Sequence, residues 1–391
     1  MTFAIEPAEY RRRLAATKAS MAERGIEVLL VGDIANQYWL TGCEGWSFYL
    51  PQLVIVTHAD PEPIWIGRAM DAPGAAMTGY MEASRVLSYP ERYVHRPDRH
   101  PCDHIAACLA DRGFAKATIG YEADAYYFTP KCVDVLKQRL HGARFVEADL
   151  LVNWLRAIKS EAEIGLIRNG ARLVEKAMAA AYDLIRPGVR QCDVVGELYK
   201  IQIAGAPDYS GDLTSLCPII LAGKAGTTAH PIWSEERFPD HQVVAVELAG
   251  ACRRYHAALC RTVHLGKPAD SVRDTYAAVR EGLESVLGFA RAGVTAHDVH
   301  AAWKRVLDKH KLTKESRIGY SIGIGYPPDW GEHTVSLRAD EDTEIKENMV
   351  LHVVLGMWMT GWGLELSETI LIGRSSCEAV TRYPRELFVR A

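Results

Sequence analysis

The sequence has no long hydrophobic run and no excess of charge of one sign. Its longest apolar runs, such as Ile26 to Val31, fall far short of the roughly 20 residues that span a bilayer, and the N-terminus MTFAIEPAEYRRR has no hydrophobic signal core. Lys and Arg number 45 against 49 Asp and Glu, so no basic surplus points to nucleic acid or to an anionic membrane. We therefore expect a cytoplasmic protein without nucleic-acid or membrane partners.

Cysteine is scattered and unpaired in the sequence. The nine cysteines run from Cys43 to Cys377 without one Cys-x-x-Cys pair. An odd number with this spacing argues against a disulfide framework and against a thiolate zinc site. We expect most of them to be small buried hydrophobic residues.

Hydrophobic residues make up 48% of the 391 positions, which is enough core for two domains. Up to about residue 145, helical segments alternate with strand-like segments such as Ile26 to Val31, which predicts an α/β domain. Ser160 and Glu163 then form a capping box that opens a long amphipathic helix. We accordingly place the domains at 1–155 and 156–391.

One ten-residue segment of the second domain occurs twice. RPGVRQCDVV (Arg186 to Val195) recurs as RAGVTAHDVH (Arg291 to His300), with five of ten positions identical at a spacing of 105 residues. Each copy follows a long amphipathic helix and enters a second helix through a Gly-Val turn. The repeat predicts two related halves with an active site between them.

Four strand-like segments of the second domain carry acidic and imidazole groups among apolar residues. Their alternation places Glu247 with two alanines on one face, His256 with Ala258 and Cys260 on another, and Glu365 with Ser367 on a third. The segments are rich in β-formers and cover 242–250, 253–266, 349–358 and 364–372.

These segments resemble a known fold. The second domain is similar to the pita-bread domain shared by methionine aminopeptidase, aminopeptidase P, prolidase and creatinase, and LLVNWLRAIKSEAEIGLIRNGARL resembles its start in the two-domain members. The resemblance covers the whole chain. It implies an α+β protein, in which a smaller creatinase-type α/β domain precedes a pita-bread catalytic domain.

The resemblance also implies where a metal site would lie. Metallopeptidase members bind two metal ions through two aspartates, one histidine and two glutamates. Divalent ions need roughly four to six nitrogen or oxygen ligands, so one carboxylate and a phenol cannot hold two of them, and we expect no metal and no cofactor. The matching positions here are Glu247, Ala258, Tyr320, Val354 and Ser367.

A closer resemblance is to the ectoine hydrolases, a metal-independent family. It implies hydrolysis of the cyclic amidine ring of ectoine to N-acetyl-L-2,4-diaminobutyrate in compatible-solute catabolism, with 5-hydroxyectoine as a second candidate substrate and a downstream deacetylase as a functional partner. The segments that carry it are GWSFYLPQ, YYFTP, VNWLRAIKSE, ELAGACRRYHAALCRTV and GYSIGIGYPPDWGEHTVSLR.

Three other functions remain open from the sequence. A metal-dependent Xaa-Pro dipeptidase or aminopeptidase would need replacement ligands. A creatinase-like amidinohydrolase is disfavoured because Cys260 and Tyr320 replace a glutamate and a histidine of creatinase. A binding module without catalysis is disfavoured because His230 and Glu247 are retained.

Three residues are the catalytic candidates. His230, in TTAHPIW, lies where the superfamily has a histidine that transfers protons, and an imidazole suits this work. Glu247 would activate water or attack the amidine carbon directly, and the sequence does not choose between these routes. Glu365 would hold the amidinium N–H groups by charge-assisted hydrogen bonds. A loop-capping role for His230 and an ion pair of Glu247 with an arginine are the structural alternatives.

The candidates for substrate binding are chosen by chemistry. An arginine fork suits a carboxylate, aromatic rings suit a delocalised cation, and a phenol or imidazole can donate a proton. Glu368 ranks below Glu365 because its strand parity is opposite. In two-domain relatives the first domain reaches the neighbouring subunit's site, which implies a homodimer. The candidates are Arg338 for the carboxylate, Trp330, Trp46 and Tyr49 as aromatic walls, Tyr320 as a donor, His256 and His352 as supporting groups, and Glu368.

Overall fold

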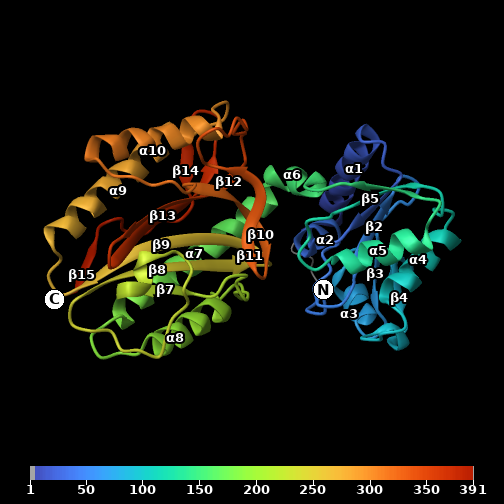
Figure 1. The fold of residues 1–391 in the computed structure, drawn as a ribbon, viewed down its shortest axis with the longest axis horizontal. Helices are drawn as coiled ribbons and strands as arrows, with labels where there is room; N and C mark the ends of the chain where they lie inside the picture. Colours follow the sequence, from blue (N-terminus) through green and yellow to red (C-terminus); the bar gives the residue numbers. More distant parts are fainter. Residues whose placement is uncertain (1–4, 391) are drawn as a thin grey trace. The chain divides into compact units, whose positions relative to one another are not determined.

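The structure, a computed structural model, describes residues 5–390. It contains two compact units, Met1–Arg156 and Ala157–Ala391, and each unit has its own sheet (Figure 1). All nine cysteines are free thiols. Within 5–390, no helix combines the length and apolar character needed to cross a bilayer.

The N-terminal unit is a six-stranded mixed sheet in the order β4-β3-β2-β1-β5-β6. Its central strands read as continuous apolar runs because both of their faces are buried. The strands are β1 (Val28–Val31), β2 (Leu53–Thr57), β3 (Ile64–Arg68), β4 (Val86–Tyr89), β5 (Thr118–Tyr121) and β6 (Arg144–Glu147). The helices are α1 (Pro7–Glu23), α2 (Ile34–Thr41), α3 (Ala72–Thr78), α4 (Pro101–Asp111), α5 (Pro130–Arg139) and α6 (Leu151–Ala157), with short 3-10 turns at Ala83–Arg85 and Glu91–Tyr93.

The C-terminal unit is a nine-stranded sheet in the order β14-β13-β12-β10-β9-β8-β7, with β11 paired to β10 and β15 to β9. Its strands are β7 (Ile219–Ala222), β8 (Gln242–Cys252), β9 (Tyr255–Leu265), β10 (Gly319–Tyr326), β11 (Asp329–Ser336), β12 (Val350–Met359), β13 (Trp362–Ile372), β14 (Cys377–Ala379) and β15 (Phe388–Arg390). Its helices are α7 (Glu161–Leu184), α8 (Gln191–Ala204), α9 (Asp270–Phe289) and α10 (Ala296–His310), with a 3-10 turn at Gly223–Thr227.

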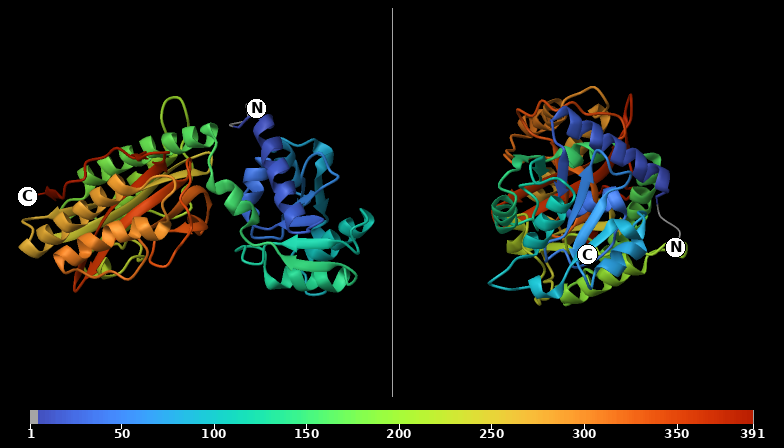
Figure 2. Two further views of the ribbon diagram at one scale, coloured as in Figure 1. Left: turned by 90° about the horizontal axis from the view of Figure 1, so that it is seen from above. Right: turned by 90° about the vertical axis from the view of Figure 1, so that its right-hand side faces the viewer.

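Long amphipathic helices cover this sheet. The predicted capping box is present, since Ser160 Oγ accepts the Glu163 N–H and the Glu163 carboxylate accepts the Ser160 N–H at 2.8 Å. The α7 helix packs on β8 and β9, whereas α9 packs on β12 and β13, and α9 and α10 lie side by side (Figure 2). The four predicted strand segments form β8, β9, β12 and β13.

The predicted repeat is visible in the backbone. Gly188 and Gly293 occupy equivalent positions, have φ of 82° and 88°, and donate their N–H groups to Phe238 O at 2.8 Å and Ile345 O at 2.9 Å. Positive φ favours glycine, so the same residue type recurs where the same turn recurs. The two helix-turn-helix segments therefore have the same local fold.

The two halves meet along β9 and β13. Thr262 Oγ1 bonds the carbonyl and the N–H of Glu365, and Thr369 Oγ1 bonds the carbonyl and the N–H of Ala258, all at 2.8 to 3.0 Å. These reciprocal contacts relate the two halves by a local twofold arrangement. They fix the inner strands on which the predicted site residues lie.

Candidate active site

A cavity of about 440 Å³ lies in the C-terminal unit. Four predicted site residues line it: His230, Glu247, Tyr320 and Glu365. Residues that the sequence did not single out complete its wall, namely Lys314, Arg317, Asp329 and Trp358. A concave site with convergent polar groups is the usual place for a small-molecule reaction.

Two buried carboxyl groups form the acidic side of the cavity. Glu247 on β8 is 7% exposed and Glu365 on β13 is 3% exposed. Burial raises the pKa of Glu247, the Cys260 thiol lowers it by hydrogen bonding, and Asp329 raises it further. Burial followed by repulsion from Glu247 raises the pKa of Glu365 well above its ordinary value. Among the described residues Glu365 Oε2 has no hydrogen-bond partner, which is costly unless a ligand supplies one.

Tyr320 on β10 is held by two ring systems. Its hydroxyl accepts the Trp330 Nε1–H at 2.9 Å and lies 3.2 Å from His352 Nδ1, while His352 Nε2 lies 2.8 Å from Ser367 Oγ. Burial lowers the pKa of His352 to about 3, so the ring is neutral. In the tautomer with the proton on Nδ1, the Tyr320 oxygen accepts two N–H groups and its own proton is free to point into the cavity.

Two cationic side chains also line the cavity. Lys314 donates to Gly356 O at 2.8 Å, and burial lowers its pKa against the attraction of Glu365. The Arg317 guanidinium lies 4.4 Å from the centre of the Tyr320 ring and donates to Ser336 Oγ at 3.1 Å. The cavity therefore presents carboxyl groups and cations to one small ligand.

Both parts of the chain match family models. Residues 13–158 match the creatinase/prolidase N-terminal domain, and residues 165–374 match metallopeptidase family M24. The chain is also 40% identical over 389 residues to an ectoine hydrolase from Halomonas elongata, which covers 98% of this chain and 97% of that protein. The chain belongs to family M24. This M24 protein is a hydrolase, and the predicted resemblance to the ectoine hydrolases is confirmed.

Two further relatives are informative. The M24 protein is 38% identical over 383 residues to an uncharacterized hydrolase/peptidase from Sinorhizobium fredii, with 98% of each chain covered. A prolidase from Thermococcus sibiricus superposes with a TM-score of 0.83 at 19% identity and covers 97% of this chain and 99% of that one. This second likeness concerns the fold alone, and it confirms the predicted fold class.

The donor groups of this M24 protein do not fit a dinuclear metal site. Ala258 and Val354 offer no ligand atom. The ligand atoms of Glu247, Cys260 and His352 lie within 4.8 Å of one another, but burial among carboxylates raises the pKa of the Cys260 thiol well above its ordinary value. Both ring nitrogens of His352 already face hydroxyl groups. Hard or borderline cations need more charged and unengaged donors than these.

Three predicted binding residues lie behind the cavity wall. Trp330 is fully buried and supports Tyr320. His256 accepts the Ser215 N–H at 3.0 Å and bonds Arg254 O at 2.7 Å, and burial lowers its pKa to about 4. His352 bridges Tyr320 and Ser367. Trp358 therefore lines the cavity, whereas Trp330 does not, and the two histidines contact other residues of the unit.

Two predicted residues lie elsewhere in the unit. The Arg338 side chain is 58% exposed, lies 3.9 Å from the Glu341 carboxylate and does not line the cavity. Glu368 is fully buried and bonds Arg261 and Arg385, both at 2.8 Å. Strand parity turns Glu368 to the opposite face from Glu365. The arginine that lines the cavity is Arg317 and not Arg338, and Glu368 is held by two arginines on the other face of β13.

Trp46 and Tyr49 belong to the N-terminal unit, where they are 50% and 62% exposed. Their contact with substrate in a neighbouring subunit stays a prediction.

The sequence did not identify Lys314 and Arg317 as cavity residues, because they precede β10 in a segment without periodicity. Strand alternation could have identified Trp358, since it continues the alternation of Val354 and Gly356 along β12 into the cavity.

Proposed function

We propose that this protein hydrolyses ectoine to N-acetyl-L-2,4-diaminobutyrate without a metal ion, with 5-hydroxyectoine as a second substrate. The observation that carries the proposal is the cavity that buried Glu247 and Glu365 line together with Lys314 and Arg317. Ectoine is a zwitterion with an amidinium ring and a carboxylate. A site with carboxyl groups and cations complements both charges of this molecule, and the 40% identity to an ectoine hydrolase supports the assignment.

Electrostatics favour carboxylates over metal ions beside such a ring. At about 4 Å and an effective dielectric of about 20, one carboxylate attracts a unit cation by about 4 kcal/mol, whereas a dication repels it by about 8 kcal/mol. Two buried carboxyl groups with raised pKa also gain a counter-charge when the amidinium binds. The binding of substrate therefore promotes ionisation of the groups that act on it.

The reaction requires water to add to the amidinium carbon and a ring nitrogen to leave. Glu247 takes a proton from water, or attacks the carbon itself before water releases the product; both routes need its ionised form. Tyr320 keeps its proton and donates a hydrogen bond through its hydroxyl to the oxygen that the carbon gains. His230 delivers a proton to the departing nitrogen, the ring C–N bond breaks, and an amide and an ammonium group result.

Other groups orient the substrate. Glu365 accepts an amidinium N–H at its unpartnered Oε2. Arg317 and Lys314 bind the substrate carboxylate, and Trp358 covers the delocalised ring. A homodimer with Trp46 and Tyr49 near the neighbouring site, a cytoplasmic location and a downstream deacetylase remain predictions from the resemblance.

A substrate panel tests this proposal. Purified protein is incubated separately with ectoine, 5-hydroxyectoine, creatine and a Xaa-Pro dipeptide, and the products are followed by proton NMR and mass spectrometry. We expect ring opening of ectoine with the gain of one water and no turnover of creatine or the dipeptide. Cleavage of the dipeptide with ectoine left intact would instead assign a prolidase.

A further inference from the structure

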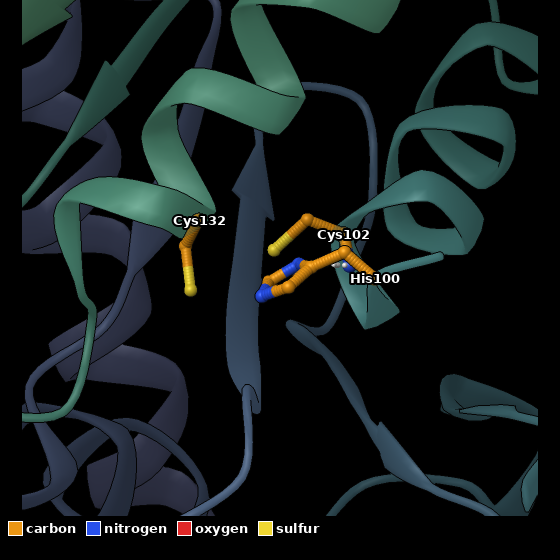
Figure 3. A group of neighbouring side chains, drawn as sticks. All are labelled: His100, Cys102 and Cys132. Carbon is orange, nitrogen blue, oxygen red and sulfur yellow. Dashed lines mark hydrogen bonds between the residues drawn. The ribbon is translucent and has the colours of Figure 1, made fainter. Parts of the chain in front are cut away.

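Three side chains of types that can bind a metal ion lie close together in the N-terminal unit, far in sequence from the cavity residues (Figure 3). The ligand atoms of His100, Cys102 and Cys132 lie within 4.8 Å of one another. Cys102 and Cys132 are 0% and 1% exposed, whereas His100 is half-buried. The two cysteines lie 30 residues apart, so no Cys-x-x-Cys spacing marks the group.

Two helix N-termini bring these side chains together. His100 is the N-cap of α4, Cys102 lies in its first turn, and Cys132 lies in the first turn of the adjacent α5. The positive ends of two helix dipoles stabilise thiolates there. Hydrogen bonding from Cys102, opposed by burial and aided by Thr129, lowers the pKa of the Cys132 thiol to about 7. The same hydrogen bond, together with burial, raises the pKa of the Cys102 thiol well above its ordinary value, so Cys102 loses its proton only when an ion takes its place.

The His100 ring is aimed at the sulfur atoms. Its Nδ1 accepts the Cys102 N–H at 3.1 Å, and Figure 3 shows the rest of the imidazole reaching into the space between Cys102 and Cys132. The backbone N–H of His100 donates to the Asp103 carboxylate at 2.7 Å. Asp103 thus holds the first turn of α4 in a way that does not depend on the imidazole.

We propose that His100, Cys102 and Cys132 form a zinc-binding site with one position left for water. Two thiolates and one imidazole are the donors that zinc prefers over magnesium or calcium. The two thiolates also cancel the charge of a divalent ion, so the ion can be buried at this place. The half-buried His100 leaves one side of the site open to water.

Binding requires a small closure and the loss of protons. Zinc bonds of about 2.3 Å to sulfur and about 2.0 Å to nitrogen set tetrahedral ligand atoms about 3.5 to 3.8 Å apart. The ligand atoms now lie within 4.8 Å of one another, so the closure is at most about 1.3 Å. Two thiol protons leave to solvent. The imidazole proton moves from Nε2 to Nδ1, which ends the bond from the Cys102 N–H while the Asp103 bond remains. The ion then joins α4 to α5.

Cobalt and zinc titration of the full-length protein tests the site. Chelator-treated, reduced protein is titrated with Co²⁺, and thiolate-to-cobalt charge-transfer absorption is recorded before displacement by Zn²⁺. The variants are His100→Asn, which keeps a good N-cap, and Cys102→Ser with Cys132→Ser. Cys108→Ser, on the same α4 helix but outside the group, is the matched control.

We expect one equivalent of cobalt with thiolate absorption in the wild type and the control, at least tenfold weaker binding by His100→Asn, and none by the double variant. Zinc should raise the unfolding temperature of the wild type and of the Cys108→Ser control. It should not raise that of His100→Asn or of the double variant. Ectoine turnover should be equal in all of them, which separates this site from the proposed function. Absent absorption in the reduced wild type, unchanged binding by His100→Asn, or absorption that persists in the double variant would overturn the proposal.

Discussion

The two halves of the C-terminal unit have the same backbone plan and different chemistry. In the first hairpin Glu247 on β8 is paired with Cys260 on β9, and in the second Val354 on β12 is paired with Ser367 on β13. Cys260 and Ser367 are 107 residues apart and bond each other, Cys260 N to Ser367 Oγ, at 2.6 Å. The scaffold is repeated, but the side chains that face the cavity are not.

This difference makes the site asymmetric. The first half places its carboxyl group on the outer strand β8, and the second half places Glu365 on the inner strand β13, at the position equivalent to Ala258. Both cavity cations, Lys314 and Arg317, come from the second half. A symmetric scaffold with unequal side chains thus suits a substrate whose two ends carry opposite charges.

The largest effect is expected from the carboxylate of the first half. Glu247→Gln keeps the shape but cannot take a proton or attack carbon, so kcat should fall by about a thousandfold. Steady-state ectoine turnover measures this, with thermal unfolding as the control for folding. Activity within tenfold of wild type would show that the first half does not supply the reactive group.

The pH dependence of ectoine turnover should report the ionisation of Glu247. Burial raises the pKa of Glu247 to about 7, so kcat/KM of the free enzyme should fall about tenfold per unit as pH decreases below 7.

The pKa of Glu247 also predicts how stability depends on pH. Because this folded-state pKa exceeds the unfolded value, the folded protein holds an extra proton, and the contribution of Glu247 to the free energy of unfolding falls as pH rises from about 4.5 to 7. Glu247→Gln should flatten that part of the stability profile; an unchanged profile would contradict the assignment.

The cationic side of the second half should affect binding more than chemistry. Arg317→Met removes a charged partner of the substrate carboxylate, so KM for ectoine should rise by roughly 10- to 100-fold with a smaller change in kcat. An ectoine analogue without the carboxylate is the control, because its KM should not respond. Equal losses for both compounds would mean that Arg317 acts only by packing on Tyr320.

A smaller effect is expected behind the cavity wall. Trp330→Phe removes one N–H donor to Tyr320, so kcat should fall by about fivefold. Trp303→Phe is the matched control, because Trp303 is also fully buried and its Nε1 has no hydrogen-bond partner in the part of the chain described. The same loss of activity in both variants would indicate a packing defect and not the loss of the Tyr320 contact.

The smallest effect is expected from an exposed residue. Arg338→Ala should change ectoine kcat/KM by less than about twofold, since its long, exposed ion pair contributes little. A loss as large as that of Arg317→Met would restore Arg338 as the carboxylate partner.

Strand alternation predicted the acidic side of the site but not its cations. Period-2 patterning placed Glu247 on one face and separated Glu365 from Glu368, because these residues lie on long regular strands. Lys314 and Arg317 lie in a connection, where no periodicity fixes direction. Alternation also could not show on which side of the sheet Trp330 lies. His100, Cys102 and Cys132 meet only through the packing of α4 on α5, which no local spacing encodes.

We propose that the carboxylates of the cavity hold a cationic ring and that turnover needs no metal ion. The most direct measurement is ectoine turnover by protein that has been stripped with a chelator and shown by elemental analysis to contain no divalent metal. We predict the same rate before and after stripping, without stimulation by added Mn²⁺ or Zn²⁺. Loss of turnover on stripping, with recovery on addition of either ion, would show that the enzyme depends on a metal ion.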